Sequence, residues 1–237
     1  MLERGMMSWK ASLFGGLLLV GSVSSAQAVV IEDFESGSLA GYTNTSSGTV
    51  AAAYAHDGAF GLGTQGSEWI YRTNSLVSVG DTLSAWMLLD NPVDGRAYFG
   101  FGTDGGGTQS FVLAPNTGDI RFQDNPGFGF SELNSSPQSF AADTWYRAEV
   151  LWGAGGAVTG NLYGSDGTTL LNSVSSTVSY SSSGGIAFRG LGGVKAFDTV
   201  EVRSTPAPVP EPGTLALLGI GLAGLAGLGW RRRTSMA

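Results

Sequence analysis

The fold is decided by the stretch Trp145-Tyr146-Arg147-Ala148-Glu149-Val150-Leu151-Trp152. In an extended strand, successive side chains point to opposite faces. One face then consists of residues that we expect to be buried, namely Tyr146, Ala148, Val150 and Trp152. The other face carries Arg147 and Glu149, for which a cross-strand charge partner and a ligand contact are both open explanations. The stretch therefore predicts a strand that covers a core with one face.

Similar runs of alternating, β-branched or aromatic residues recur on both sides, separated by Gly, Asn, Asp and Ser. No segment between Val29 and Val202 has sustained helical spacing of apolar residues, which favours an all-β domain. About twelve strands must close their edges or stack face to face, which leaves a sandwich, a jelly roll or a barrel, and we favour the β-sandwich. We expect strands at residues 29–34, 60–64, 69–72, 82–89, 97–101, 109–113, 119–123, 145–152, 158–163, 172–178, 185–188 and 196–202.

The N-terminus has the pattern of a secretory signal peptide. Arg4 and Lys10 are basic, Leu13–Val20 is apolar, and Ala26-Gln27-Ala28 supplies small residues for cleavage. A membrane span needs roughly 20 apolar residues, and this run is shorter, so an uncleaved anchor fits less well. We expect a signal peptide over residues 1–28 and a mature β-sandwich domain over residues 29–203.

The charge of the mature domain argues against nucleic acid as a partner. Residues 29–205 contain seven basic and seventeen acidic side chains, and no two basic residues are adjacent. A nucleic-acid binder needs a basic surface that displaces counterions from phosphates. The chain has no cysteine, so disulfides play no part in its stability.

The sequence lacks the usual catalytic motifs, and we expect no enzyme. Laminarinase-type enzymes carry two carboxylates in a Glu-x-Asp-x-x-Glu strand, whereas Glu32 to Glu35 has a different spacing. His56 is the one histidine and reads as a turn residue, and no Gly-x-Ser-x-Gly elbow occurs. One histidine without cysteine cannot build a usual zinc site. An unrecognised carboxylate pair with glycoside activity stays open as the alternative.

A saccharide-binding site needs aromatic faces and a few polar groups. We select Trp69, Phe128, Phe130 and Arg147 as candidate ligand-binding residues, because two of these aromatics stand in a loop. Trp86 and Trp145 lie within expected strands and are expected to fill the core. We therefore predict weak binding of carbohydrate, with a purely structural envelope protein as a further alternative.

Several segments resemble the concanavalin A-like lectin/glucanase superfamily, which includes laminin G domains. The resemblance is carried by residues 143–150, 161–167, 184–189 and 196–202 and spans about Leu83 to Val202. It implies a jelly roll. The opening strand Ile31-Glu32-Asp33-Phe34-Glu35 also resembles the galactose-binding-like jelly roll of carbohydrate-binding modules, and the choice between the two types stays open.

In that second group of modules, carboxylates near the first and last strands can hold a structural calcium ion. The resemblance implies Asp33, Glu35 and Asp198 as calcium ligands, and calcium takes six to eight oxygens from carboxylates and carbonyls. Surface carboxylates without a metal are the alternative explanation.

The C-terminal residues have the composition of a membrane anchor. A Pro-rich linker over residues 204–209 precedes eighteen uncharged residues, 213–230, and then Arg231, Arg232 and Arg233. As a helix, the uncharged segment would rise about 27 Å, close to the roughly 30 Å of a hydrocarbon core. The arginines place residues 234–237 in the cytoplasm and the domain outside. An ordinary single-pass anchor is one explanation.

The order of Pro210-Glu211-Pro212, apolar segment, arginines and chain end resembles the PEP-CTERM sorting domain, here over residues 210–233. The resemblance implies recognition and cleavage by an exosortase, in Gram-negative bacteria that make extracellular polysaccharide. Pro210, Glu211 and Pro212 would be the recognition element, and the helix with Arg231 to Arg233 would hold the chain in the membrane. We expect an exported protein that is transiently anchored and then reaches the cell surface or extracellular matrix.

The first prediction concerns this processing. Prolines keep the backbone before the expected helix extended, the conformation that a protease cleft can bind. We expect the mature protein to lack everything after about Pro212. Intact-mass measurement of the protein from the extracellular fraction tests this, and Arg231 to Arg233 still attached there would refute it.

Overall fold

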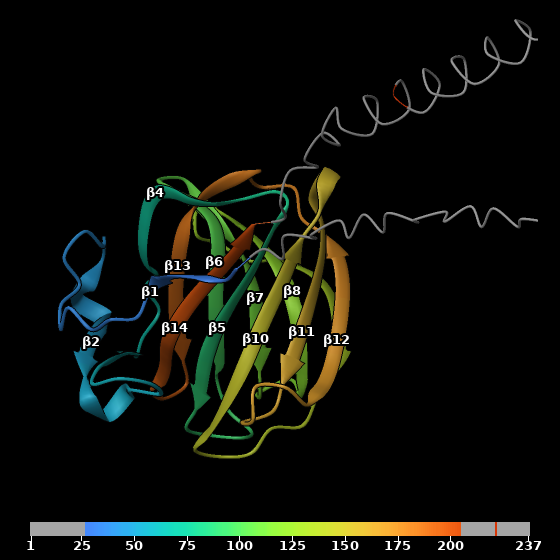
Figure 1. Cartoon of the computed structure of the whole chain (residues 1–237). Coiled ribbons are helices and arrows are strands. Elements are labelled where there is room, and N and C mark those ends of the chain that lie inside the picture. Colours follow the sequence, from blue (N-terminus) through green and yellow to red (C-terminus); the bar gives the residue numbers. More distant parts are fainter. Residues whose placement is uncertain (1–26, 205–220, 222–237) are drawn as a thin grey trace, which may run out of the picture.

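The computed structural model describes residues 27–204 and Gly221, and residues 27–204 form two packed antiparallel sheets (Figure 1). The described residues do not include Pro210 to Pro212, Arg231 to Arg233 or, apart from Gly221, the expected span 213–230. Within the described part, no helix has the length and apolar character needed to cross a membrane. Three short 3-10 helices lie between strands, at Thr45–Ser47, Ala52–Tyr54 and Ala154–Gly156.

The larger sheet has eight strands, and Figure 1 shows β14, β5, β10, β11 and β12 side by side in the nearer layer. Its order is β12 (Leu170–Thr177), β11 (Ala157–Tyr163), β10 (Thr144–Trp152), β5 (Asp81–Leu89), β14 (Lys195–Ser204), β3 (Gly61–Thr64) and β2 (Gly48–Ala51), with β1 (Val29–Glu32) also paired to β14. The stretch 145–152 is thus central strand β10. Its predicted buried face, Tyr146, Ala148, Val150 and Trp152, is in the core.

The second sheet has six strands. Its order is β4 (Ile70–Ser78), β13 (Ser183–Leu191), β6 (Arg96–Asp104), β7 (Gly107–Ala114), β8 (Asp119–Pro126) and β9 (Ser131–Pro137). Side-chain amides join its edge strand β9 to edge strand β12 of the other sheet: Asn134 Nδ2 donates to Ser175 O at 2.8 Å, and Asn172 Nδ2 to Pro137 O at 2.7 Å. These bonds close one side of the sandwich.

A row of four phenylalanines crosses the inner face of the six-stranded sheet. Phe188 pairs with Phe99, Phe99 with Phe111, and Phe111 with Phe122, on β13, β6, β7 and β8. All four side chains are fully buried. Phe188 also packs on Phe197 of the opposite sheet, with 5.1 Å between ring centroids. The row is therefore the contact surface on which the two sheets meet.

The predicted all-β sandwich is confirmed, and each of the twelve expected strands has a counterpart among the fourteen observed in the described residues. The first expected strand, 29–34, ends at Glu32, because Phe34 has a φ of 57° and turns its ring into the core. Strands β2 and β9 were not predicted. Both are at sheet edges, and β9 reads Ser-Glu-Leu-Asn-Ser-Ser-Pro, with mostly exposed polar residues.

The phenylalanine row generates a stability prediction. Truncation of a fully buried phenylalanine leaves a cavity, so Phe188→Ala should lower the free energy of unfolding by about 3–5 kcal/mol. Phe130→Ala is the matched control, since 53% of the Phe130 side chain is exposed, and it should cost less than about 1 kcal/mol. Urea unfolding of both variants measures the difference. Equal losses would contradict the assigned core.

Candidate ligand-binding site

The outer face of the six-stranded sheet carries a second row of side chains, set by the phenylalanine row beneath it. Arg189 pairs with Tyr98, Tyr98 with Val112, and Val112 with Arg121, across β13, β6, β7 and β8. Each residue precedes or follows one of the buried phenylalanines, so alternation turns it away from the core. The candidate site lies on this outer face.

Aromatic rings gather at the β4, β13 and β6 part of this face. The Trp69 and Tyr98 ring centroids are 5.3 Å apart, and those of Tyr71 and Phe128 are 4.6 Å apart. The Trp69 indole Nε1 donates a hydrogen bond to the Phe128 carbonyl oxygen at 3.3 Å. Trp69 and Tyr98 are buried, whereas Phe130 is exposed. Phe130 therefore presents its ring to solvent above a fixed aromatic layer.

The segment between β8 and β9 brings Phe128 and Phe130 to this place. Gly127 and Phe128 both have left-handed backbone conformations, with φ of 60° and 58°, which fold the segment back over the sheet. Asn125 holds it there: its Nδ2 donates to Gly129 O at 2.7 Å, and its Oδ1 accepts from Ser110 Oγ at 2.8 Å. Asn125 is fully buried, so these bonds fix the position of Phe130.

Arg189 lies beneath these rings. Its guanidinium carbon is 4.5 Å from the Phe130 ring centroid, 5.3 Å from that of Tyr98 and 5.7 Å from that of Trp69. The side chain is buried, and within the described residues its Nε and Nη1 have no hydrogen-bond partner and it forms no ion pair. Burial away from water lowers the pKa of Arg189.

The rings offset only part of the cost of burying this charge. Cation–π contacts contribute about 0.5–1 kcal/mol at exposed sites and about 2 kcal/mol when desolvated. Removing a guanidinium from water without an anion beside it costs several kcal/mol. Arg189 is therefore a buried cation whose charge is not balanced by a carboxylate in the described part of the chain.

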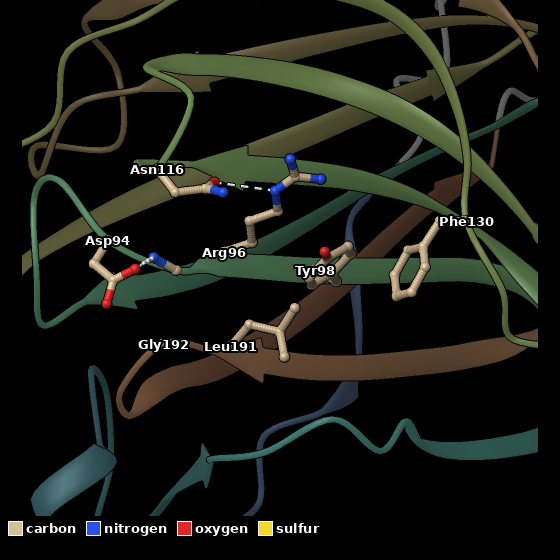
Figure 2. Close-up of a pocket in the computed structure, with 8 residues that line it drawn as sticks. Asp94, Arg96, Tyr98, Asn116, Phe130, Leu191 and Gly192 are labelled. Carbon is tan, nitrogen blue, oxygen red and sulfur yellow. Dashed lines mark hydrogen bonds between the residues drawn. The ribbon is translucent and has the colours of Figure 1, made fainter.

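A pocket of about 360 Å³ adjoins this cluster (Figure 2). Tyr98 and Phe130 form part of its wall, and Arg96 points toward Asn116, with 3.0 Å between Nε and Oδ1. The pocket is lined by Asp94, Gly95, Arg96, Tyr98, Asn116, Phe130, Leu191 and Gly192. It therefore combines aromatic faces with charged and amide groups.

The other two arginines on this face are neutralised. Arg96 Nη1 is 2.8 Å from Glu132 Oε1, and Arg121 Nη1 is 2.6 Å from Glu132 Oε2. Arg121 also donates through Nε to Asp119 Oδ1 at 2.7 Å. The hydrogen bond from Arg96, followed by the charge of Arg121, lowers the pKa of Glu132. Glu132 is consequently held ionised, which makes it a poor proton donor.

The structure brings Trp69, Phe128 and Phe130 together, but it does not bring Arg147 to them. Arg147 is on β10, on the outer face of the eight-stranded sheet. Its Nη2 is 3.0 Å from Glu149 Oε2, and its guanidinium lies over the Tyr163 ring at 5.1 Å. The charge partner is thus Glu149 of the same strand.

The expectation that Trp86 and Trp145 fill the core is wrong. Both are only partly buried on the outer face of the eight-stranded sheet. The His56 ring stacks on Trp86 with 3.8 Å between centroids and meets Trp145 edge-on at 5.2 Å. Their position follows from alternation with buried neighbours such as Ala85, Met87 and Tyr146.

The structure does not assemble Asp33, Glu35 and Asp198 into a metal-ligand cluster. Within residues 27–204, no three or more His, Cys, Asp or Glu side chains are grouped so that they could hold a metal ion. Glu35 Oε1 accepts backbone hydrogen bonds from Ala59 at 2.8 Å and Phe60 at 3.0 Å. Asp198 is buried, and its Oδ2 accepts from the His56 and Asp57 amides at 2.7 and 2.9 Å. Burial raises the pKa of Asp198. Glu35 and Asp198 hold the segment before β3, whereas Asp33 Oδ1 accepts from the Glu35 backbone amide at 3.1 Å.

Sequence reasoning missed Arg189 and its central position. Arg189 follows Phe188, so alternation already places it opposite a core phenylalanine. The sequence does not reveal the cross-strand register that puts Tyr98 beside Arg189. It also does not reveal that the segment between β8 and β9 folds back and brings Phe130 to Arg189.

Residues 208–233 match the PEP-CTERM protein-sorting motif, which confirms the resemblance inferred from the tail. The motif indicates an exported protein that is sorted and processed by an exosortase. No curated protein sequence matches the chain.

Solved structures with similar folds include the carbohydrate-binding module CBM66 from Bacillus subtilis, with 15% identity, a TM-score of 0.53, and coverage of 69% of this chain and 96% of the module. A xylan β-1,4-xylosidase from Bacillus halodurans has 10% identity and a TM-score of 0.53, with 80% of this chain aligned to 41% of the enzyme. The exoplasmic/lumenal domain of VIP36 has 12% identity, a TM-score of 0.47, and coverage of 71% and 83%. The first two establish the fold likeness, and the expected jelly roll is confirmed.

The tether formed by Asn125 generates a prediction about the shape of the site. Asn125→Ala leaves the buried Ser110 hydroxyl and the Gly129 carbonyl without their partner, which should lower the free energy of unfolding by about 1–3 kcal/mol. Amide hydrogen exchange of residues 127–130 should accelerate more than that of the rest of the sheet. Asn134→Ala removes only exposed hydrogen bonds, one to the Ser175 carbonyl oxygen and one from the Ser135 backbone amide, and serves as control. Unchanged exchange in residues 127–130 would show that Asn125 does not hold the segment.

Proposed function

We propose that this protein is an exported, non-enzymatic protein that binds extracellular polysaccharide weakly through the outer face of its six-stranded sheet. Its signal peptide, residues 1–28, would be removed on export across the cytoplasmic membrane of a Gram-negative bacterium. The apolar segment 213–230 would anchor it transiently as a transmembrane helix, with Pro210, Glu211 and Pro212 as the recognition element and Arg231 to Arg233 on the cytoplasmic side. After cleavage the domain would reside at the cell surface or in the extracellular matrix.

The observation that carries the proposal is the exposed Phe130 ring beside a pocket that is lined by both apolar and polar groups. Sugar rings stack on aromatic faces, and a few polar groups set their orientation. Phe130 supplies the exposed face, and the buried Tyr98 ring packs behind it. Arg96 and Asn116 are hydrogen-bonded to each other at the pocket wall. Asn125 fixes the segment that carries Phe130, so this arrangement exists before a ligand arrives.

The placement of the carboxylates supports binding rather than glycoside cleavage. General acid catalysis by a carboxyl group needs a raised pKa and a second carboxylate across the sugar. Glu132, near the pocket, has a lowered pKa because Arg96 and Arg121 hold it ionised. Asp198 has a raised pKa but is fully buried on the other sheet and bonded to backbone amides.

Binding to glycans is the test. A glycan array followed by calorimetry, with and without calcium, should detect saccharide binding, and Phe130→Ala should weaken it about tenfold through loss of a stacking face. Trp86→Ala is the matched control on the opposite face. Loss of binding in the Trp86 variant alone would move the site to the eight-stranded sheet.

Two other outcomes distinguish the alternatives. An absence of binding to any glycan, with or without calcium, would favour a purely structural envelope protein. Release of soluble products from polysaccharide would establish a glycoside-active enzyme, and replacement of each carboxylate on the outer faces would then identify the pair.

A further inference from the structure

The buried cation on the ligand-binding face is the feature that the fold itself does not explain. Arg189 is 5% exposed, and its Nε and Nη1 have no hydrogen-bond partner in the described residues. The arginines on the neighbouring strands of the same sheet all have carboxylate partners. Arg72 on β4 pairs with Glu32, Arg96 on β6 with Glu132, and Arg121 on β8 with Asp119 and Glu132. Only Arg189 lacks a counter-charge among them.

The position of Arg189 relates this unbalanced charge to the pocket. The Tyr98 and Phe130 rings that contact the guanidinium also line the pocket, as does Leu191, which lies on the same face of β13 two residues further on. Figure 2 shows Phe130 beside Tyr98, with Leu191 below Tyr98. Arg189 itself does not line the pocket, because the Phe130 ring lies between the guanidinium and solvent. Rotation of the exposed Phe130 side chain about its own torsions, on the backbone that Asn125 holds in place, would open the guanidinium to the pocket.

The chemistry of the group defines what it would bind. A guanidinium offers paired N–H donors in a plane, which match the two oxygens of a carboxylate. The surrounding rings of Trp69, Tyr98 and Phe130 exclude water and would strengthen such a pair. A saccharide carboxylate would therefore find here both a stacking face and an uncompensated cation.

We infer that the pocket beside Tyr98 and Phe130 selects an acidic saccharide, a polymer of uronic acids, whose carboxylate pairs with the Arg189 guanidinium. The inference rests on the proposed function, since it names the class of polysaccharide that the same face binds. Cation–π contact alone is the competing role for Arg189, in which the residue only supports the rings.

Calorimetry with matched acid and ester ligands tests the inference on the purified protein. The probes are oligomers of glucuronate, galacturonate and mannuronate, each compared with its methyl ester, which keeps the sugar and removes the charge. At least one acid should bind about tenfold more tightly than its ester, and high salt should change the difference little, because a buried ion pair is weakly screened. Arg189→Met should abolish this preference without lowering the melting temperature, because it removes an unpaired buried charge.

Two more variants keep the result interpretable. Arg189→Lys retains the charge but not the paired donors, and should lose most of the preference even if the methionine variant fails to fold. Arg147→Met, on the opposite face, should keep the preference unchanged.

Three results would overturn the inference, and they differ in what they leave standing. Equal affinity for acid and ester in the unmodified protein would leave carbohydrate binding intact but remove selection for acids. A preference that persists in both Arg189 variants would place the charge selection elsewhere. No binding of any saccharide would overturn the inference and the proposed function together.

Discussion

The row of four phenylalanines on β13, β6, β7 and β8 is the constraint on which both faces of the six-stranded sheet depend. Phe188, Phe99, Phe111 and Phe122 stand opposite one another in register and are fully buried against the other sheet. A shift of one strand by a single residue would expose its phenylalanine and bury its polar neighbour, which is strongly unfavourable. The core therefore fixes the register, and the register fixes the outer row from Arg189 to Arg121. The site is a consequence of packing on the other side of the same strands.

Alternation within a strand was enough to predict much of this fold, because one buried face leaves a period of two in the sequence. The stretch 145–152 shows this directly, since all four residues expected inside are in the core. Strand β9 shows no such alternation, because it is an edge strand of mostly exposed polar residues. Pairing with β8 and hydrogen bonds between asparagine side chains and the backbone of β9 and β12 hold it in place. Trp86 and Trp145 were misplaced because hydrophobicity was given more weight than alternation. Trp86 covers part of its ring by stacking on His56, so it can stay on the outer face, partly exposed.

The candidate site was only half accessible to sequence reasoning. Trp69, Phe128 and Phe130 could be selected because aromatic residues in or beside a loop are unusual. Their mutual contact depends on the left-handed backbone at Gly127 and Phe128 and on the tether from Asn125. In the sequence, Arg147 and Arg189 each stand next to core residues, so the alternating pattern alone does not distinguish them. The difference between them lies in three dimensions: Glu149 lies beside Arg147, whereas rings without a carboxylate surround Arg189.

The overall charge of the domain limits how an acidic polymer could approach this site. Residues 29–205 have an excess of ten acidic side chains, so a polyanion is repelled at long range when little salt is present. At physiological ionic strength this repulsion is screened beyond about 8 Å. A buried guanidinium acts within that distance and in surroundings that exclude water, where screening is weak. Recognition of an acidic saccharide by this face would therefore depend on contact with the Arg189 guanidinium. The acidic domain would associate with polyanions at a modest rate and would have no general affinity for anions.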